Sequence, residues 1–248
     1  MSVGVSPGED RSMGMNIVAA AEALWAQHTI HLDPEPQGER HGVVNASADG
    51  EALSFVAVGD SMIAGCGVED QSEGFTPAMA SVFSDMLDRP VDWRAVGKLG
   101  ATMRRVRYRL LPQVDDHADL MVLCAGSNDL MARRTIAQWC DDLSASLDLA
   151  KDRADHVVVF SAAQLYRSPS LGKSLRHVIE GMTDEQTQAS REICERYGVR
   201  FLDMTHEDVH ADRDRFYAHD RFHPSVYGYQ CMAERVGQLL GGWMTSEL

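Results

Sequence analysis

The sequence lacks much of what membrane, secreted and nucleic-acid-binding proteins depend on. Its 248 residues hold 23 Lys and Arg against 37 Asp and Glu, a formal charge of −14. This shortage of positive charge argues against nucleic acid or anionic membrane as a partner, because both attract basic surface. No run approaches the ~20 apolar residues that span a bilayer, and the N-terminus has no basic signal-peptide region. We expect a cytoplasmic protein without a membrane anchor.

Cysteine is scarce and scattered. The five cysteines form no Cys-x-x-Cys pair, and their odd number does not suit a disulfide framework. Reduced thiols fit this pattern, and neither a thiolate metal site nor another cofactor is expected. Cys66 follows closely after a candidate functional serine, and we interpret it as a packing residue rather than a redox control.

What is present is an alternation of short apolar runs with amphipathic stretches. The runs are apolar at odd and even positions alike, which is typical of parallel strands covered on both faces. They occupy residues 53–58, 91–96, 120–125, 157–162 and 199–202. Helices are predicted over residues 76–87 and 136–149 and after Pro224, which suits a first helical position. The alternation predicts a doubly wound α/β/α sandwich, whose ligand site lies at the carboxyl ends of the strands.

The first fifty residues have a different character. Residues 1–12 are small and polar and are predicted to be disordered, and residues 33–38 read as a loop. Residues 16–27 predict a helix whose apolar face is formed by Ile17, Ala20, Ala21, Leu24 and Trp25. We interpret residues 1–50 as an N-terminal extension and residues 51–248 as one domain.

Polar signals follow three of the predicted strands. Ser61 ends Gly59-Asp60-Ser61 after the first strand, Gly100 lies in the loop after the second, and Asn128 belongs to Gly126-Ser127-Asn128-Asp129 after the third. Each alone is more typical of a turn or a helix cap. Together they would meet at one sheet edge, with the Ser61 hydroxyl in the cleft. An N–H near Gly100 and the Asn128 amide could then donate to developing negative charge.

An acid and a base precede the last predicted helix. Asp220 lies three residues before His223, in a loop that ends at Pro224. This spacing lets the carboxylate turn back to the imidazole and set its tautomer. A serine hydroxyl is a poor nucleophile without such a base, so these signals in register predict nucleophilic catalysis.

The four blocks resemble those of the SGNH (GDSL-type) hydrolase family, over about residues 53–240. The resemblance implies a three-layer α/β/α sandwich around a five-stranded, mainly parallel, flavodoxin-like sheet, and serine esterase chemistry without a metal. It implies that Ser61 is the nucleophile, His223 the base and Asp220 the partner of the base. The Ser61 N–H, Gly100 and Asn128 would then form the oxyanion hole. The residue before Gly100 is not the Asn that the family often has.

The expected activity is therefore hydrolysis of a small-molecule carboxylic ester or thioester through an acyl-enzyme. An acyltransferase, a carbohydrate O-deacetylase and a non-catalytic binding module on the same fold stay open as alternatives. Asp60 is expected to lie against the substrate. The long segment after the fourth strand, residues 165–183, is expected either to line the pocket through Leu165, Tyr166 and Leu175 or to be a surface helix.

Two further patterns compete for a function. The run His206-Glu207-Asp208-Val209-His210 matches the spacing of a zinc-protease helix, but it has no apolar helical face, and we interpret it as a solvated loop. Two groups of arginines lie near the cleft ends of their elements and suit either an anionic substrate or a solvated surface with acidic partners. They are Arg104, Arg105, Arg107 and Arg109, followed by Arg133 and Arg134.

Overall fold

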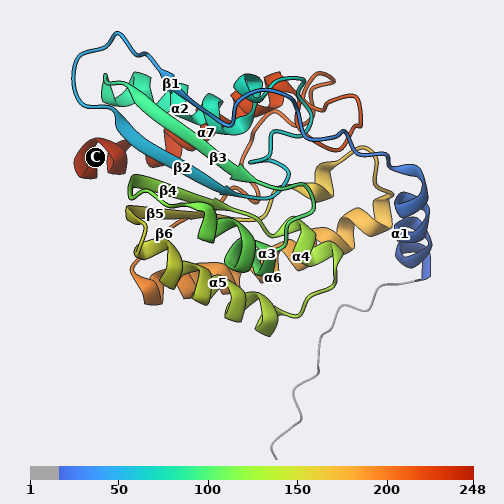
Figure 1. Cartoon of the computed structure of the whole chain (residues 1–248). Helices are drawn as coiled ribbons and strands as arrows, with labels where there is room; N and C mark the ends of the chain where they lie inside the picture. The colour runs from blue at the N-terminus through green and yellow to red at the C-terminus, as the bar shows by residue number, and fades with distance from the viewer. Residues whose placement is uncertain (1–16) are drawn as a thin grey trace, which may run out of the picture.

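A six-stranded sheet runs through the middle of the molecule (Figure 1). In the computed structural model, which describes residues 17–248, the strands lie in the order β1-β3-β2-β4-β5-β6. Their bounds are β1 His41–Val44, β2 Leu53–Gly59, β3 Val91–Gly97, β4 Ala118–Cys124, β5 Ala154–Phe160 and β6 Arg200–Leu202. All neighbours pair in parallel except β1, which is antiparallel to β3. The α/β/α prediction is confirmed, with one strand more than the five expected.

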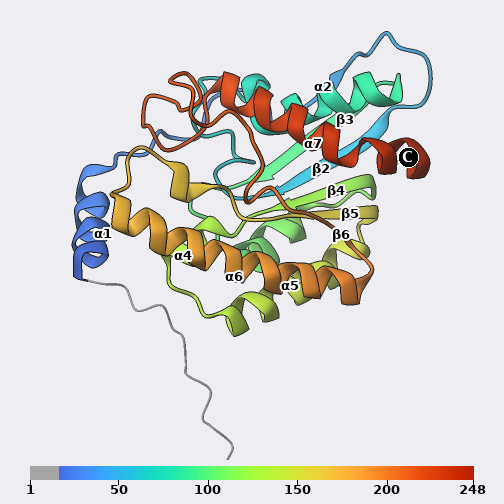
Figure 2. The same ribbon diagram turned by 180° about the vertical axis from the view of Figure 1, so that it is seen from behind.

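Helices cover both faces of the sheet, as the two opposite views show (Figures 1 and 2). α2 (Phe75–Leu87) and α7 (Val226–Glu247) pack together on one face, and α5 (Ile136–Lys151) and α6 (Lys173–Tyr197) lie on the other. The shorter elements are α3 Met103–Arg105, α4 Ser127–Met131, the π-helical turn η2 Val106–Leu110 and the 3-10 turns η1 Gln71–Glu73, η3 Leu111–Gln113 and η4 Leu165–Arg167. No helix within residues 17–248 is long and apolar enough to cross a bilayer.

The two-faced burial of the strands explains their continuous apolar sequence. In β2, Phe55 and Ala57 join the core beneath α2 and α7, whereas Val56 and Val58 join the core beneath α5. Successive side chains of a strand point to opposite faces, so a strand between two helical layers must be apolar at both. This requirement is the reason that the four internal strands, β2 to β5, could be predicted from the sequence.

Local capping sets where the predicted helices begin. Thr135 and Gln138 form a reciprocal capping box at the start of α5. Ser225 caps α7 by accepting a hydrogen bond from the Gly228 N–H, so Pro224 lies one residue before the cap rather than at the first helical position. A proline there still ends the preceding loop, because its ring fixes the backbone angle φ.

The N-terminal part differs from its prediction in two ways. α1 (Ile17–Thr29) forms, but Ala19 and Ala26 are buried while Ile17, Leu24 and Trp25 are exposed. The expected apolar face was wrong because α1 packs with small residues against the start of α6, where close approach favours alanine. The predicted disorder of residues 1–12 lies outside the described residues.

The strand β1 was missed altogether. It is a four-residue edge strand with two half-exposed and two exposed positions, so it carries no apolar run to detect. Its pairing with β3 places residues 41–44 within the sheet of the main domain. A boundary at residue 50 therefore separates a strand from the sheet to which it belongs.

Candidate active site

The turn after β2 holds Ser61 at the carboxyl edge of the sheet. A Cβ atom on Gly59 would lie 2.0 Å from the Cys124 carbonyl oxygen, so only glycine lets β2 leave the sheet this close to β4. The Asp60 N–H donates to that same carbonyl at 3.1 Å, and the Cys66 N–H donates to the Ser61 carbonyl at 2.9 Å. These contacts hold Ser61 in a compact turn at the end of the strand.

The loop before α7 packs directly against this turn. Gly67 has a φ of +100°, and a Cβ atom there would lie 2.3 Å from the Pro224 carbonyl oxygen and 2.9 Å from the His223 Cβ. The Tyr229 hydroxyl of α7 donates to the Cys66 carbonyl at 2.6 Å. Two segments about 160 residues apart are thus held together by a glycine that leaves room for the histidine.

Asp220 and His223 form a tight buried pair. The His223 Nδ1 lies 2.6 Å from the Asp220 Oδ2, and both side chains are at most 3% exposed. The backbone N–H groups of Phe222 and His223 donate to Oδ1, each at 2.9 Å. Burial alone would raise the pKa of Asp220, but the His223 side chain and the backbone donors outweigh it and lower that pKa to about 2. Asp220 is therefore an anion at neutral pH.

Ser61, Asn128 and His223 line one apolar cavity of about 90 Å³. Its wall is formed mainly by Phe75, Phe160, Met204, Val209, Phe216 and Met232. The His223 Nε2, the Ser127 Oγ and the Gln164 Oε1 are buried there without a hydrogen-bond partner among the described residues. Unpartnered buried polar atoms are uncommon in folded proteins, so these three mark a place for polar groups of a ligand.

Three candidate hydrogen-bond donors for an anion lie on the turns and loops that follow β2, β3 and β4. No described residue accepts a hydrogen bond from the backbone N–H of Ser61 or Gly100. Gly100 has a φ of +76°, a region that suits glycine, and it lies in the loop after β3. The Asn128 Nδ2 donates one hydrogen to the Ala101 carbonyl at 3.0 Å, which ties Asn128 to that loop and leaves its second hydrogen unused.

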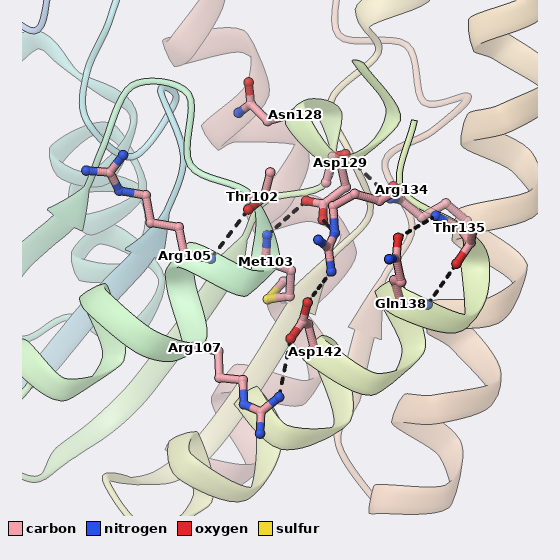
Figure 3. A network of polar contacts seen from close by, with 12 residues as sticks. Thr102, Met103, Arg105, Arg107, Asn128, Asp129, Arg134, Thr135, Gln138 and Asp142 are labelled. Atoms are coloured by element: carbon pink, nitrogen blue, oxygen red, sulfur yellow. Dashed lines mark hydrogen bonds and ion pairs between the residues drawn. The ribbon is translucent and has the colours of Figure 1, made fainter. Parts of the chain in front are cut away.

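A buried polar network fixes these donors from behind (Figure 3). The Met103 N–H donates to the Asp129 Oδ2 at 2.8 Å, and the Arg134 Nε lies 3.0 Å from the Asp129 Oδ1. Arg134 also pairs with Asp142, which in turn lies 3.3 Å from Arg107. Asp129 therefore joins the loop that carries Gly100 to the helix that carries Asn128.

Asp60 is also buried at this cavity, but its environment differs from that of Asp220. It is 4% exposed and accepts a hydrogen bond from the Met62 N–H at 3.1 Å. Burial raises its pKa to about 6, since this N–H and the nearby His223 compensate only in part. Asp60 lines the cavity, as expected of a residue that lies against the substrate.

Only one of the three expected pocket residues after the fourth strand reaches the cavity. Leu165 lines it. Tyr166 instead donates its hydroxyl to the Thr205 carbonyl at 2.7 Å, and Leu175 packs in the small core between α1 and α6. The assignment of Tyr166 and Leu175 to the pocket is corrected, because the 3-10 turn η4 directs successive side chains apart and α6 carries Leu175 away from the cavity.

The run from His206 to His210 is a loop, as expected. His206 pairs with Asp184 at 2.7 Å, and His210 lies 3.5 Å from Asp208. Within it, however, Val209 is buried and lines the cavity. A single apolar residue in a polar run is a weak signal, and the prediction of a fully solvated loop missed it.

Residues of the N-terminal part also contact this site, and no sequence pattern predicted these contacts. The Asp33 N–H donates to the Asp220 Oδ2 at 3.1 Å, and the Glu35 Oε1 accepts from the Leu99 N–H at 2.8 Å. Cys66 fits its interpretation as a packing residue, because burial raises the pKa of its thiol to about 12. A thiol with so high a pKa is unreactive at neutral pH.

A serine at a strand end and a carboxylate–imidazole pair at the same cavity, on an α/β/α fold, are typical of hydrolases of this fold class. Residues 57–231 match the sequence pattern of the GDSL-like lipase/acylhydrolase family. Because this match covers well over half of the chain, the protein belongs to that family and is an acylhydrolase of the esterase type.

Several solved structures share this fold at low sequence identity. The lipase/acylhydrolase from Enterococcus faecalis is 20% identical, with a TM-score of 0.56 over 77% of this chain and 96% of that one. The psychrotrophic esterase from Pseudoalteromonas sp. is 15% identical, with a TM-score of 0.59 over 77% and 98%. The family 3 carbohydrate esterase from Clostridium thermocellum is 16% identical, with a TM-score of 0.61 over 79% and 98%. No curated protein sequence matches this chain.

Proposed function

We propose that the protein hydrolyses carboxylic esters or thioesters of short acyl chains, with Ser61 as nucleophile, His223 as general base and Asp220 as the partner of the base. The observation that carries this proposal is the His223 imidazole, whose Nδ1 is held by an anionic Asp220 while its Nε2 is buried without a partner at the cavity that Ser61 lines. A base needs a free nitrogen near the nucleophile, and catalytic hydrogen bonds often close only when substrate binds.

The reaction would follow from these positions. The Ser61 Oγ attacks the acyl carbon while its proton passes to the His223 Nε2, and the carbonyl oxygen becomes an oxyanion. The N–H groups of Ser61 and Gly100 and the free hydrogen of the Asn128 amide would donate to this oxyanion. The imidazolium then protonates the leaving alcohol or thiol, and a water molecule activated by His223 releases the acid.

The size of the cavity supports a short acyl chain. A dry cavity of about 150 Å³ is known to accept a benzene ring, and this one has about 90 Å³. Its wall is mainly apolar, and the polar residues that line it include Asp60, Ser61 and Asn128. An acetyl to butyryl chain suits that space, whereas an octanoyl chain would have to leave it.

Two measurements test the proposal. Purified protein should hydrolyse 4-nitrophenyl acetate and butyrate with a higher kcat/KM than the octanoate, and Ser61→Ala should lose at least about 10³-fold in kcat. A fluorophosphonate should label the wild type covalently and leave Ser61→Ala unlabelled. Near-wild-type turnover by a folded Ser61→Ala variant would refute the assignment, and a preference for octanoate would refute the short-chain restriction.

A further inference from the structure

A second, open hollow lies on the other side of the loop that carries Gly100. This groove has a volume of about 960 Å³, and we call it the basic groove. Its charged lining consists of five cations and one carboxylate, a formal charge of +4. They are Arg40, Lys98, Arg104, Arg105, Arg109 and Glu35. Such a concentration of positive charge is unexpected on a chain whose net charge is −14.

Three of these cations are not neutralised by the protein. Glu35 pairs with Arg40 at 2.8 Å and with Lys98 at 2.9 Å. Arg104, Arg105 and Arg109 are exposed, and none of them has an ion pair with a carboxylate among the described residues. The Arg104 guanidinium lies 5.7 Å from the centre of the Tyr108 ring, and Tyr108 is 52% exposed.

The neighbouring arginines show the opposite arrangement. Arg107 belongs to the same segment but turns inward to Asp142, and Arg134 pairs with Asp129 and Asp142. Figure 3 shows the Arg105 guanidinium directed away from this buried network. Arg107 and Arg134 are therefore paired with carboxylates, whereas the three exposed arginines that line the groove are not.

The groove is close to the site of ester cleavage. Gly97, Lys98 and Thr102 line it. Ala101, the residue before Thr102, accepts the hydrogen bond of Asn128, which lines the cavity. The loop of residues 97–102 therefore contacts both hollows. A leaving group that extends from the scissile bond past Gly100 would enter the groove.

We propose that the basic groove binds a phosphate group on the alcohol or thiol side of the ester. Guanidinium groups hold phosphate oxygens through paired hydrogen bonds, and three of them free of carboxylates can share one dianion. This inference rests on the proposed function and adds the substrate class: a short acyl group in the apolar cavity and a phosphorylated leaving group in the open groove.

A matched pair of substrates tests this directly. The acetate ester of 4-hydroxyphenyl phosphate and that of 4-methoxyphenol share the acyl group and a similar aryl leaving group, and only the former carries a phosphate. We expect the wild type to hydrolyse the phosphorylated ester with a kcat/KM at least tenfold higher in 20 mM salt. The ratio should fall toward one in 0.5 M NaCl, where the charges are screened.

Charge reversal gives the matched variants. In Arg105→Glu/Arg109→Glu the ratio of the two kcat/KM values should fall at least tenfold. Arg196→Glu/Arg200→Glu changes the net charge equally at the opposite end of the sheet, and there the ratio should stay within twofold of the wild type. Equal ratios in the two double variants, or a wild-type ratio near one, would overturn the proposal.

The test of the basic groove and the test of the proposed function can fail independently of each other. Hydrolysis of the neutral ester that is lost in Ser61→Ala supports the serine mechanism whichever ester is preferred. Suppose that the wild type prefers the phosphorylated ester and that Ser61→Ala hydrolyses this ester as fast as the wild type does. The serine assignment then fails, and the groove is still a phosphate site.

A separate set of contacts supports a second inference, on residues 33–40. The Asp33 N–H donates to Asp220, and the Glu35 carboxylate accepts from the Leu99 N–H beside Gly100. Arg40 donates to the Gly97 carbonyl at 2.8 Å. These residues lie outside the stretch 57–231 that matches the family, yet they contact the partner of the base and the loop of one oxyanion donor.

We infer that Glu35 is a positioning residue that orients the Gly100 N–H. Glu35→Ala removes the acceptor for the Leu99 N–H, so kcat for the neutral ester should fall about tenfold with little change in KM, because only the transition state carries the oxyanion. Glu35→Gln keeps an oxygen at the same place and should restore most of kcat. It also removes the one negative charge of the groove, so the preference for the phosphorylated ester should rise.

A purely structural role predicts otherwise. In that case both variants would lower the melting temperature and kcat in parallel, because both lose the ion pairs to Lys98 and Arg40. Unchanged kcat in a folded Glu35→Ala variant would overturn the inference outright. Thermal melts of both variants accompany the kinetics for this reason.

Discussion

Two carboxylates from different segments are both influenced by the charge of His223, and their pKa values shift in opposite directions. Asp220, in the loop before α7, accepts hydrogen bonds from three backbone N–H groups and the imidazole, and its pKa is lowered to about 2. Asp60, in the turn after β2, accepts from the Met62 N–H and has a pKa raised to about 6 by burial. Burial is the largest influence on the pKa of Asp60, whereas at Asp220 the imidazole and the backbone donors outweigh burial.

The largest expected effect comes from removing the charge of Asp220. Asp220→Asn keeps the shape but presents an amide to the His223 Nδ1, which favours the wrong tautomer. We expect kcat for 4-nitrophenyl acetate to fall by about 10³–10⁴-fold, as such a change does in serine hydrolases generally. Steady-state kinetics with circular dichroism as the folding control measures this. A loss below tenfold would mean that His223 does not depend on Asp220.

A substitution of Asn128 should lower kcat by a smaller factor. Asn128→Ala removes one of three proposed oxyanion donors, and kcat should fall by about 10²–10³-fold, or ~3–4 kcal/mol. KM should change little, because the donor acts on charge that appears only in the transition state. If KM rises while kcat is unchanged, Asn128 binds the ground state instead.

The opposite pKa shifts predict opposite dependences of stability on pH. The pKa of Asp60 is higher in the folded protein than its ordinary value of 3.8, so its contribution to stability is full below that value and is lost as the pH rises through about 6. The pKa of Asp220 is lowered, so its contribution is present above 3.8 and is lost as the pH falls toward 2.

The Asp60→Asn variant tests the contribution of Asp60 to this pH dependence. A shift of about two pKa units corresponds to about 3 kcal/mol, so between pH 4 and pH 7.5 the free energy of unfolding of the wild type should fall by nearly that amount relative to the variant. Urea unfolding at the two pH values measures the difference. A constant offset between wild type and variant would show that Asp60 does not titrate in this range.

The smallest expected effect concerns Asp129, whose pKa burial also raises to about 6 although it has one N–H donor and one arginine. Asp129→Asn retains an acceptor for the Met103 N–H but loses the pairing with Arg134, which keeps Asp142 as its partner. We expect a loss of about 2 kcal/mol in the free energy of unfolding. A neutral result in chemical denaturation would show that Asp142 alone suffices for Arg134.

The site could be predicted from the sequence to the extent that its signals are local. Ser61, Asn128 and the pair Asp220–His223 each follow or precede a recognisable element, and the parallel sheet brings their elements to one edge. The lining of the cavity could not be foreseen in this way. Tyr166 and Leu175 lie near the site in the sequence but point elsewhere, whereas Val209 lies in a polar run and reaches the cavity.

The contribution of the N-terminal part had no sequence signal at all. Asp33 acts through its backbone N–H, a group that every residue other than proline possesses, and Glu35 is one of many acids in an acidic chain. The edge strand β1 is too short and too exposed to show a pattern. Contacts of this kind depend on where the segment lies in the folded structure.

The sequence by itself determined the layered fold and the candidate site residues, because burial on two faces requires apolar strands and the proposed catalysis requires particular side chains at strand ends. Only the tertiary structure decided which hollow is small and apolar, which is open and basic, and that residues 33–40 contact the loops beside them. Those properties arise from the approach of segments distant in the chain, and no local spacing encodes the distance at which they meet.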